Sequence, residues 1–316
     1  MPRTKAAPSR DGHDAPQTWR NRLWFWGLRV VAAVAVVGAC WGGLALARRW
    51  VEHAWLYPSQ PPAVQLKNRP VWMTDLLAQQ IERAARPRGA NSALDHDLLR
   101  TIADSLKTNP WIRQVHGVRR VYGQTPGDTI EVDCTYREPR AMVLWGIDYY
   151  LVDAEGVLLP EKFSARDVPA IMFVGQGSQR QVNVRVIEGV KSARPVEPGE
   201  KWNGADVTAG LELAGLLYGR ACAEDIWRIN VENFAGRRSN TESQITLKTR
   251  HNTEVRWGEP LNATFHVEVD AAQKLQRLNL LKEQYGRVDA NHSWVDIRFD
   301  KVTCPANENQ SADNRR

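Results

Sequence analysis

The amino-acid sequence of 316 residues lacks the patterns on which most known enzyme classes depend. It contains no GxSxG, no Walker-type GxxxxGK(S/T) and no HExxH sequence. The Gly-Gln-Gly sequence at Gly175–Gly177 is followed by Arg180, where a dinucleotide-binding fingerprint has its third glycine. Asp153 and Glu155 stand in a predicted hairpin turn, where residues of these types serve the turn itself. We therefore expect no catalytic residue, no bound cofactor and no enzyme activity.

Cysteine and histidine are too few and too scattered to predict a disulfide framework or a metal site. The four cysteines include no Cys-x-x-Cys pair, and the seven histidines are spread along the chain. Cys40 lies in an apolar run, and Cys134 alternates with apolar residues, which predicts a small buried side chain. A disulfide between Cys222 and Cys304 stays open at this point. We expect no bound metal.

A surplus of positive charge is missing from most of the chain, although the formal net charge is +6. The first 49 residues hold eight of the 42 lysines and arginines and two of the 36 aspartates and glutamates, so residues 50–316 carry equal numbers of both signs. A nucleic-acid-binding surface needs a concentrated positive field, which this balance does not supply. The first 29 residues lack a helical stripe, so they also make a poor nucleic-acid-binding tail for a membrane sensor.

One long hydrophobic run is present near the N-terminus. Val30–Ala47 contains 18 residues without a charge, which as a helix covers about 27 Å and nearly spans a bilayer core. We predict a cytoplasmic tail at residues 1–22 and a single membrane-spanning helix at 23–47. The orientation follows from four nearby Lys and Arg residues before the helix against three after it. The alternative is a signal peptide cleaved at Ala45–Ala47.

The chain after the apolar run predicts a small domain of mixed structure. Residues 48–62 contain the sequence Pro-Ser-Gln-Pro-Pro and are predicted to be a linker. Within residues 63–139, a short strand precedes two helices, one capped by Thr74 and the other by Ser92 with Asp95. Two strands follow these helices. The order β-α-α-β-β predicts one small sheet covered on one face by two helices.

Residues 140–304 predict a second, mainly antiparallel β domain with two helices. Apolar residues alternate along several short segments, which indicates strands at 142–145, 149–152, 157–159, 171–174, 227–231, 245–249, 255–257 and 293–302. Helical spacing marks residues 207–218 and 270–285, the latter capped by Asp270 and ended by Gly286. Residues 305–316 are polar and predicted to be disordered. The predicted fold class is α+β, preceded by one transmembrane helix.

Several of these segments resemble the FtsQ/DivIB family of bacterial division proteins. The resemblance covers about residues 20–304, and its motifs lie at 109–123, 128–145, 149–160, 253–260 and 294–302. It implies that residues 63–139 form a POTRA domain and that residues 140–304 form the β domain of this family. The sequence departs from the family at Tyr136 and Arg137, where a glutamate is usual, and between Gly258 and Lys274, which is longer than expected.

The resemblance also implies a function. It predicts a non-catalytic scaffold of the inner membrane at the division septum, which recruits the FtsB/FtsL (DivIC/FtsL) pair and through it the septal peptidoglycan synthase. Strand addition to the open edge of a sheet is the physical means, since an edge strand has unpaired backbone donors and acceptors. The matching partner-binding residues are Arg298, Phe299, Lys301 and Val302. Arg298 is expected to pair with a partner carboxylate and Phe299 to fill an apolar pocket.

Alternatives exist at both the residue and the protein level. Phe299 can instead turn inward with Ile297 and Val295, which leaves Arg298 in solvent. A POTRA-containing envelope assembly or secretion factor is one rival function, although such proteins continue into a membrane barrel built of many alternating strands. An anchored envelope enzyme of unrecognised type is the other rival, and a deep pocket with convergent titratable groups would favour it.

Overall fold

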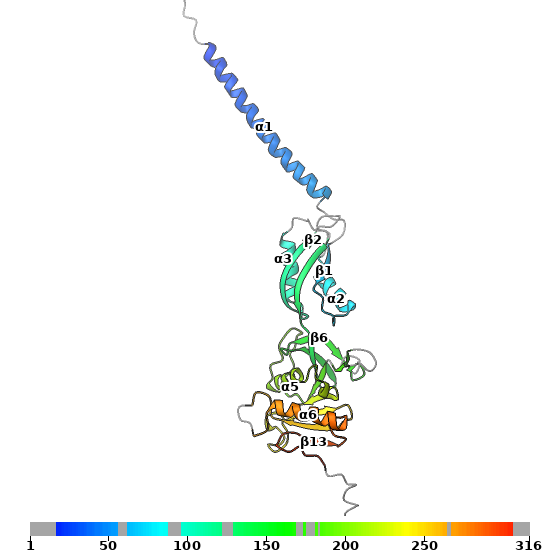
Figure 1. Cartoon of the computed structure of the whole chain (residues 1–316). Coiled ribbons are helices and arrows are strands. Elements are labelled where there is room, and N and C mark those ends of the chain that lie inside the picture. The colour runs from blue at the N-terminus through cyan, green and yellow to red at the C-terminus, as the bar shows by residue number, and fades with distance from the viewer. Residues whose placement is uncertain are drawn as a thin grey trace, which may run out of the picture. The chain divides into compact units, whose positions relative to one another are not determined.

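The computed structural model describes residues 17–55, 62–87, 96–121, 129–168, 173–174, 181–182, 184–263 and 267–305. The chain divides into two compact units, which consist of residues 1–63, 87–98 and 120–130, and of residues 64–86, 99–119 and 131–316. Helices and sheets are combined along the chain (Figure 1), which confirms the predicted α+β class.

The N-terminal helix α1 (Gln17–Trp55) is continuous over 39 residues (Figure 1). Within it, Trp26–Trp50 is a 25-residue stretch that is long and apolar enough to cross a membrane. Trp41 and Leu44 are 77% and 71% exposed, so the protein does not bury this apolar surface itself. The helix predicted at residues 23–47 therefore lies inside α1. Residues 48–55, predicted as linker, are helical, and residues 56–61, which hold most of the proline-rich sequence, lie outside the described residues.

The next part of the chain has the predicted order of elements. Three strands form a sheet in the order β1-β3-β2, and two helices lie between β1 and β2 in the sequence. The elements are β1 (Ala63–Lys67), α2 (Asp75–Ala85), α3 (His96–Lys107), β2 (Ile112–Val121) and β3 (Thr129–Tyr136). The Thr74 side chain accepts a hydrogen bond from the Leu77 backbone N–H at 3.2 Å, which confirms the predicted cap of α2. The cap predicted for Ser92 and Asp95 lies outside the described residues.

Strand β3 alternates between buried and more exposed side chains, as its sequence predicts. Ile130, Val132 and Cys134 are each at most 5% exposed. Burial raises the pKa of the Cys134 thiol to about 11, with the nearby Asp133 as a smaller cause. Cys134 is therefore a small buried core residue with an inert thiol, as expected.

The larger sheet contains eight strands in the order β13-β12-β11-β10-β9-β4-β5-β6. They are β4 (Pro139–Trp145), β5 (Asp148–Asp153), β6 (Leu158–Phe163), β9 (Arg185–Glu188), β10 (Ile226–Asn230), β11 (Ile245–Thr249), β12 (Glu254–Gly258) and β13 (Trp294–Asp296). Four neighbouring pairs are antiparallel, and the pairs β4/β9, β9/β10 and β12/β13 are parallel. The sheet is thus more mixed than predicted. Helices connect β9 to β10 and β12 to β13, whereas the strands β5 to β8 lie between β4 and β9 in the sequence. A separate two-stranded sheet joins β7 (Phe173–Val174) and β8 (Gln181–Val182).

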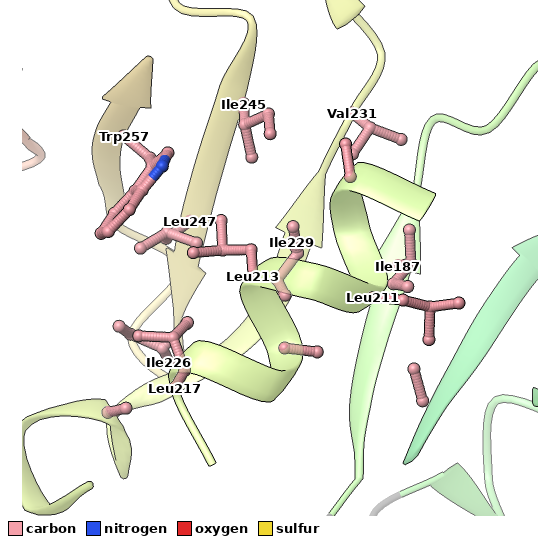
Figure 2. Close-up of a cluster of buried hydrophobic side chains, with 14 of the residues drawn as sticks. Ile187, Leu211, Leu213, Leu217, Ile226, Ile229, Val231, Ile245, Leu247 and Trp257 are labelled. Atoms are coloured by element: carbon pink, nitrogen blue, oxygen red, sulfur yellow. The ribbon is translucent and has the colours of Figure 1, made fainter. Parts of the chain in front are cut away.

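Helices α5 (Ala205–Leu216) and α6 (Ala271–Tyr285) contribute to one apolar core with this sheet. Figure 2 shows Leu213 of α5 close to Ile229 and Leu247 of the central strands. A Cβ atom on Gly210 would come within 2.8 Å of the Ile187 side chain, so α5 lies closer to the sheet than a larger residue would permit. From α6, a buried stripe at helical spacing completes the core: Leu275, Leu278 and Leu281.

The ends of α6 confirm two predictions. The Asp270 side chain accepts a hydrogen bond from the Gln273 N–H at 2.7 Å, and Gly286 ends the helix in the left-handed region. The hairpin turn is also confirmed, since the Asp153 carboxylate accepts the backbone N–H groups of Glu155 and Val157. All four cysteines are free, so the open possibility of a disulfide to Cys304 is not realised in this structure.

The last predicted strand is wrong in its extent. The sequence predicts a strand over residues 293–302, but β13 covers only Trp294–Asp296. The chain then bends and returns, and Thr303 forms a single antiparallel bridge with Asp296. We call residues 301–304 the C-terminal hook.

Gly189, which follows β9, tests the packing of this sheet. Its φ is +80°, and a Cβ atom would lie 2.6 Å from the backbone nitrogen of Glu232, which the adjacent Val231–Glu188 hydrogen bond holds in place. In Gly189→Ala, the new Cβ atom would clash with the backbone of Glu232, and alanine would be strained at this positive φ. The unfolding free energy should therefore fall by about 3 kcal/mol, as measured by denaturant titration of the full chain in detergent.

Gly219→Ala is the matched control, because Gly219 also has a positive φ, whereas a Cβ atom at this position would have no neighbouring atom within 4 Å. It should cost only about 1 kcal/mol. Equal losses in both variants would contradict the close contact at Gly189.

Candidate partner-binding edge

The two edges of the eight-stranded sheet differ in how their backbone is covered. At the β6 edge, Leu158 exchanges backbone hydrogen bonds with the neighbouring loop, accepting from the Gly199 N–H and donating to the Glu200 carbonyl. Pro160 lies within β6 and has no N–H to offer a further strand. Charged residues occupy the next two positions, Glu161 and Lys162. This edge is therefore protected against strand addition over Leu158–Pro160.

The β13 edge is only partly covered. The pairing of β13 with β12 directs the backbone groups of Ser293, Val295 and Ile297 toward β12, as the Glu254–Ser293 and Ile297–Arg256 hydrogen bonds show. The groups of Trp294 and Asp296 consequently point outward. Those of Asp296 pair with Thr303, whereas those of Trp294 make no hydrogen bond with another described residue.

The C-terminal hook meets β13 at one residue. The Asp296 N–H donates to the Thr303 carbonyl at 2.7 Å, and the Thr303 N–H donates to the Asp296 carbonyl at 3.1 Å. Because this pair uses both groups of Thr303, the backbone groups of Val302 and Cys304 point away from β13. Within the described part of the chain they have no backbone partner.

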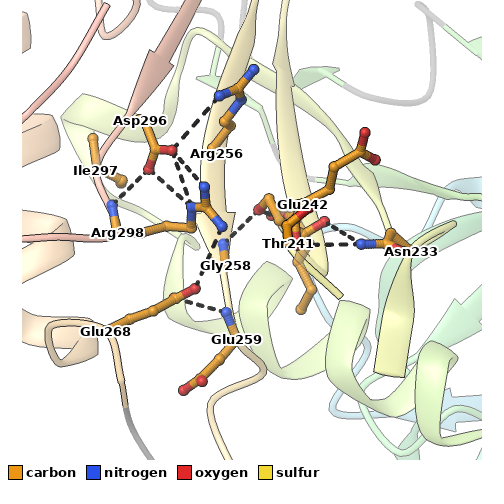
Figure 3. A network of polar contacts seen from close by, with 12 residues as sticks. Asn233, Thr241, Glu242, Arg256, Gly258, Glu259, Glu268, Asp296, Ile297 and Arg298 are labelled. Carbon is orange, nitrogen blue, oxygen red and sulfur yellow. Dashed lines mark hydrogen bonds and ion pairs between the residues drawn. The ribbon is translucent and has the colours of Figure 1, made fainter. Parts of the chain in front are cut away.

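Asp296 and Arg298 form a buried ion pair beside this edge (Figure 3). The Arg298 side chain donates from Nε to both carboxylate oxygens, at 3.0 and 3.1 Å, and from Nη2 to Oδ2 at 2.7 Å. Burial raises the pKa of the Asp296 carboxyl, but the hydrogen bonds from Arg298 outweigh it, so the pKa lies below its ordinary value. The same hydrogen bonds raise the pKa of Arg298. Both groups are therefore charged at neutral pH.

A second buried ion pair adjoins the first. Glu268 accepts from Lys274 at 2.7 Å. Arg298 lies 4.0 Å from the other Glu268 oxygen, and Figure 3 shows these two side chains. The Lys274 ammonium is also 5.3 Å from the ring centre of Trp257, which is fully buried. These contacts join the start of α6 to β12 and to the bend after β13.

Arg277 of α6 fixes the bend itself. Its guanidinium donates to the carbonyl of Ile297 at 2.9 Å, to that of Asp300 at 3.0 Å, and to that of Phe299. The remaining carbonyl of the bend, that of Arg298, accepts from the Val269 N–H at 2.9 Å. All four consecutive carbonyls from Ile297 to Asp300 are thus held by the protein.

A shallow groove lies between α6 and the hook. Its volume is about 280 Å³, and its apolar walls come from α6, β13 and the hook. Leu280 and Tyr285 are 45% and 53% exposed, and Val302 is 40% exposed. An engineered cavity of about 150 Å³ holds a benzene ring, so this groove has room for one large apolar side chain.

The four residues predicted to bind a partner fall into two groups. Phe299, Lys301 and Val302 are exposed around the edge. Arg298 is 9% exposed and its guanidinium is occupied by Asp296, so pairing with a partner carboxylate would have to compete with this bond. The alternative arrangement, with Phe299 inward and Arg298 in solvent, is the reverse of what the structure shows. The role of all four residues in binding stays a prediction.

Sequence reasoning missed Arg277 and Asp296, which hold the bend. Asp296 stands two residues before Arg298, a spacing that places both on one face of a strand, and this was an available signal. For Arg277 there was none, because its partners are backbone carbonyls 20 to 23 residues away.

Away from this edge, the described residues provide few candidates for a metal site or a binding site. Among them, no group of three His, Cys, Asp or Glu side chains could hold a metal ion. A polar recess of about 300 Å³ on the sheet face is lined by side chains such as Asn233, Thr246 and Arg256. Asn233 uses its amide for backbone carbonyls and N–H groups of the surrounding loop, so its role is structural.

Comparison with protein-family models and with curated proteins finds no match for this chain.

Asp296→Asn tests the ion pair through pH. A carboxyl whose pKa is lower in the folded state stabilises the fold above its unfolded pKa of about 3.9 and loses this contribution as pH falls through the folded value. Breaking the buried pair should cost about 3 kcal/mol of unfolding free energy at pH 7. The difference between wild type and variant should shrink below about pH 4, as measured by denaturant titration at several pH values.

Asp300→Asn is the control, since Asp300 lies in the same bend with an exposed side chain. It should change the unfolding free energy little at any pH. A wild-type advantage over Asp296→Asn that stays constant down to pH 3 would show that the carboxylate charge does not stabilise the edge.

Proposed function

We propose that this protein is a membrane-anchored, non-catalytic scaffold that recruits partner proteins by strand addition at its C-terminal sheet edge. In this proposal, α1 spans the inner membrane once with its N-terminus in the cytoplasm, and residues 63–139 and 140–304 are the POTRA and β domains of an FtsQ/DivIB-type protein. The partners are an FtsB/FtsL (DivIC/FtsL) pair, through which the septal peptidoglycan synthase is recruited to the division site.

The observation that carries the proposal is the difference between the two sheet edges. The β6 edge is protected over Leu158–Pro160 by the proline and by the hydrogen bonds of Leu158. The other edge keeps outward backbone groups at Trp294, Val302 and Cys304 beside an apolar groove. Folded proteins usually protect exposed edges, so an edge that stays accessible next to an apolar surface favours a docking role.

The chemistry of the edge favours an extended peptide over a small molecule. Backbone donors and acceptors supply affinity for any extended chain, and alternate side chains of that chain meet the groove or the opposite face. Exposed Phe299 stands next to this edge and offers an aromatic anchor. We do not propose an enzymatic function, because the titratable groups that line the polar recess and the groove, such as Glu242, Glu254, His292 and Cys304, form no hydrogen bond with one another in the described part of the chain.

Phe299→Ala tests the proposal in the full chain. Removal of the exposed ring should weaken capture of the co-expressed FtsB/FtsL-type pair about tenfold, or about 1.4 kcal/mol, while the melting temperature stays near the wild-type value. Capture is measured by affinity purification from detergent-solubilised membranes over a range of partner concentrations. Localisation of a fluorescent fusion in dividing cells then tests the septal site.

Ile147→Ala is the matched control, because Ile147 is 87% exposed in the turn between β4 and β5, at the other end of the sheet. It removes a comparable apolar side chain and should leave capture unchanged. Equal capture by wild type and Phe299→Ala, with both proteins folded, contradicts the proposed edge. Arg298→Glu is unsuitable, since it places a second carboxylate against Asp296 and would unfold the bend.

A further inference from the structure

We infer that the C-terminal hook occupies the partner's place on β13 and is displaced when the partner strand binds. This inference rests on the proposed function and specifies how the same site is regulated. The hook pairs with the outward groups of Asp296, which are the groups that an added strand would use. It therefore acts as an intramolecular competitor for the edge.

The hook is held weakly. Two hydrogen bonds between Asp296 and Thr303 are its backbone attachment to β13. Every residue from Lys301 to Cys304 is exposed, so little apolar surface is buried by the hook. Segments with few buried contacts and exposed hydrogen bonds open at low free energy, without unfolding of the domain.

The point at which the hook can separate is also defined. Arg277 and the Val269 N–H hold the four carbonyls from Ile297 to Asp300, and the Asp296–Arg298 pair holds the side chains of the same bend. No comparable contact holds the described residues after Asp300, apart from the Asp296–Thr303 pair. The boundary between the fixed and the displaceable parts therefore lies between Asp300 and Lys301.

A partner strand has more to gain from β13 than the hook does. The hook satisfies two outward backbone groups, those of Asp296, whereas an added strand that extends along β13 can also satisfy the two of Trp294. Departure of the hook removes Val302 and Cys304 from the groove wall and widens access to Leu280 and Tyr285. We expect the partner to be an extended segment with a bulky apolar side chain directed at α6.

The β6 edge supports this interpretation. There, Pro160 lacks an N–H, and Leu158 is hydrogen-bonded to a loop inside the chain. At β13 the cover is instead the short, exposed hook, which pairs with the strand at one residue. A removable cover prevents edge-to-edge association of free molecules and still allows a specific partner to bind.

A reversible crosslink tests the inference. The residues opposite each other next to the Asp296–Thr303 pair are Val295 and Cys304, and both line the groove, so their side chains lie on the same face. Such non-hydrogen-bonded pairs have Cα atoms about 4.5 Å apart, within the range for a disulfide. Val295→Cys in a Cys40→Ser background thus allows the hook to be locked by oxidation to the native Cys304 and released by reduction.

Capture of the co-expressed FtsB/FtsL-type pair by the full chain is then compared in the two redox states. Displacement predicts that capture falls at least tenfold on oxidation and returns on reduction, while Cys40→Ser alone shows no redox effect. Undiminished capture by the oxidised protein, with the disulfide verified by mass, would overturn the inference and place the partner strand outside the hook. If the wild-type chain captures no partner in either state, the proposed function itself fails and the inference falls with it.

Thr303→Pro gives a second test that does not depend on a crosslink. Proline removes the N–H that donates to the Asp296 carbonyl, and so it loosens the hook without changing β13. Displacement predicts capture about fivefold tighter than wild type at an unchanged melting temperature. Weaker capture by this variant would show that the partner adds to the hook and does not replace it.

Discussion

Backbone groups at the edge of a sheet must be paired, covered or left to solvent, and this constraint affects the arrangement at both edges of the eight-stranded sheet more than any single side chain does. The eight-stranded sheet does not close on itself, so it has two edges. One edge is protected over Leu158–Pro160 by a proline and by hydrogen bonds to the loop at Gly199 and Glu200. The other is covered at a single residue, Asp296. Among the described residues, this incompletely covered strand is the feature on which the proposed function rests.

Two arginines make that edge rigid up to a defined point. Arg298 is buried against Asp296 and contacts Glu268, while Arg277 binds three carbonyls of the bend. Burying such charges costs desolvation free energy, which good geometry and full hydrogen bonding offset. In return, the shape of the edge is well defined. Strand β13 ends at Asp296, because the next four backbone carbonyls accept hydrogen bonds from Arg277 and from the Val269 N–H and not from another strand. These contacts hold the chain up to Asp300 and do not extend to residues 301–304, so the edge is ordered while the hook is loosely held.

The sequence predicted those parts of the fold that depend on local chemistry. Strand β11, the cap at Asp270 and the end of α6 at Gly286 were all correct, since alternation and capping involve neighbouring residues. The three parallel pairings and the short β13 were not predicted, because they depend on residues far apart in the sequence. Strands β4 and β9 pair although β5 to β8 lie between them, and the shape of the chain after β13 depends on Arg277 of α6. The orientation of Arg298 was missed for the same reason: an uninterrupted alternation assumed a straight strand, and the bend reverses which side chain is buried.

Strand addition at so short an edge supplies few hydrogen bonds, each worth only about 1 kcal/mol net in water. Such an interface would be weak between two freely diffusing proteins. In the proposed function, α1 and the partners are anchored in the same membrane, and confinement to one surface raises the effective concentration of the partners at this edge. The apolar helix and the small edge are then complementary parts of one proposed design. Anchoring permits an interface weak enough to be reversible, and a competing hook can regulate such an interface because its own two hydrogen bonds are of similar strength.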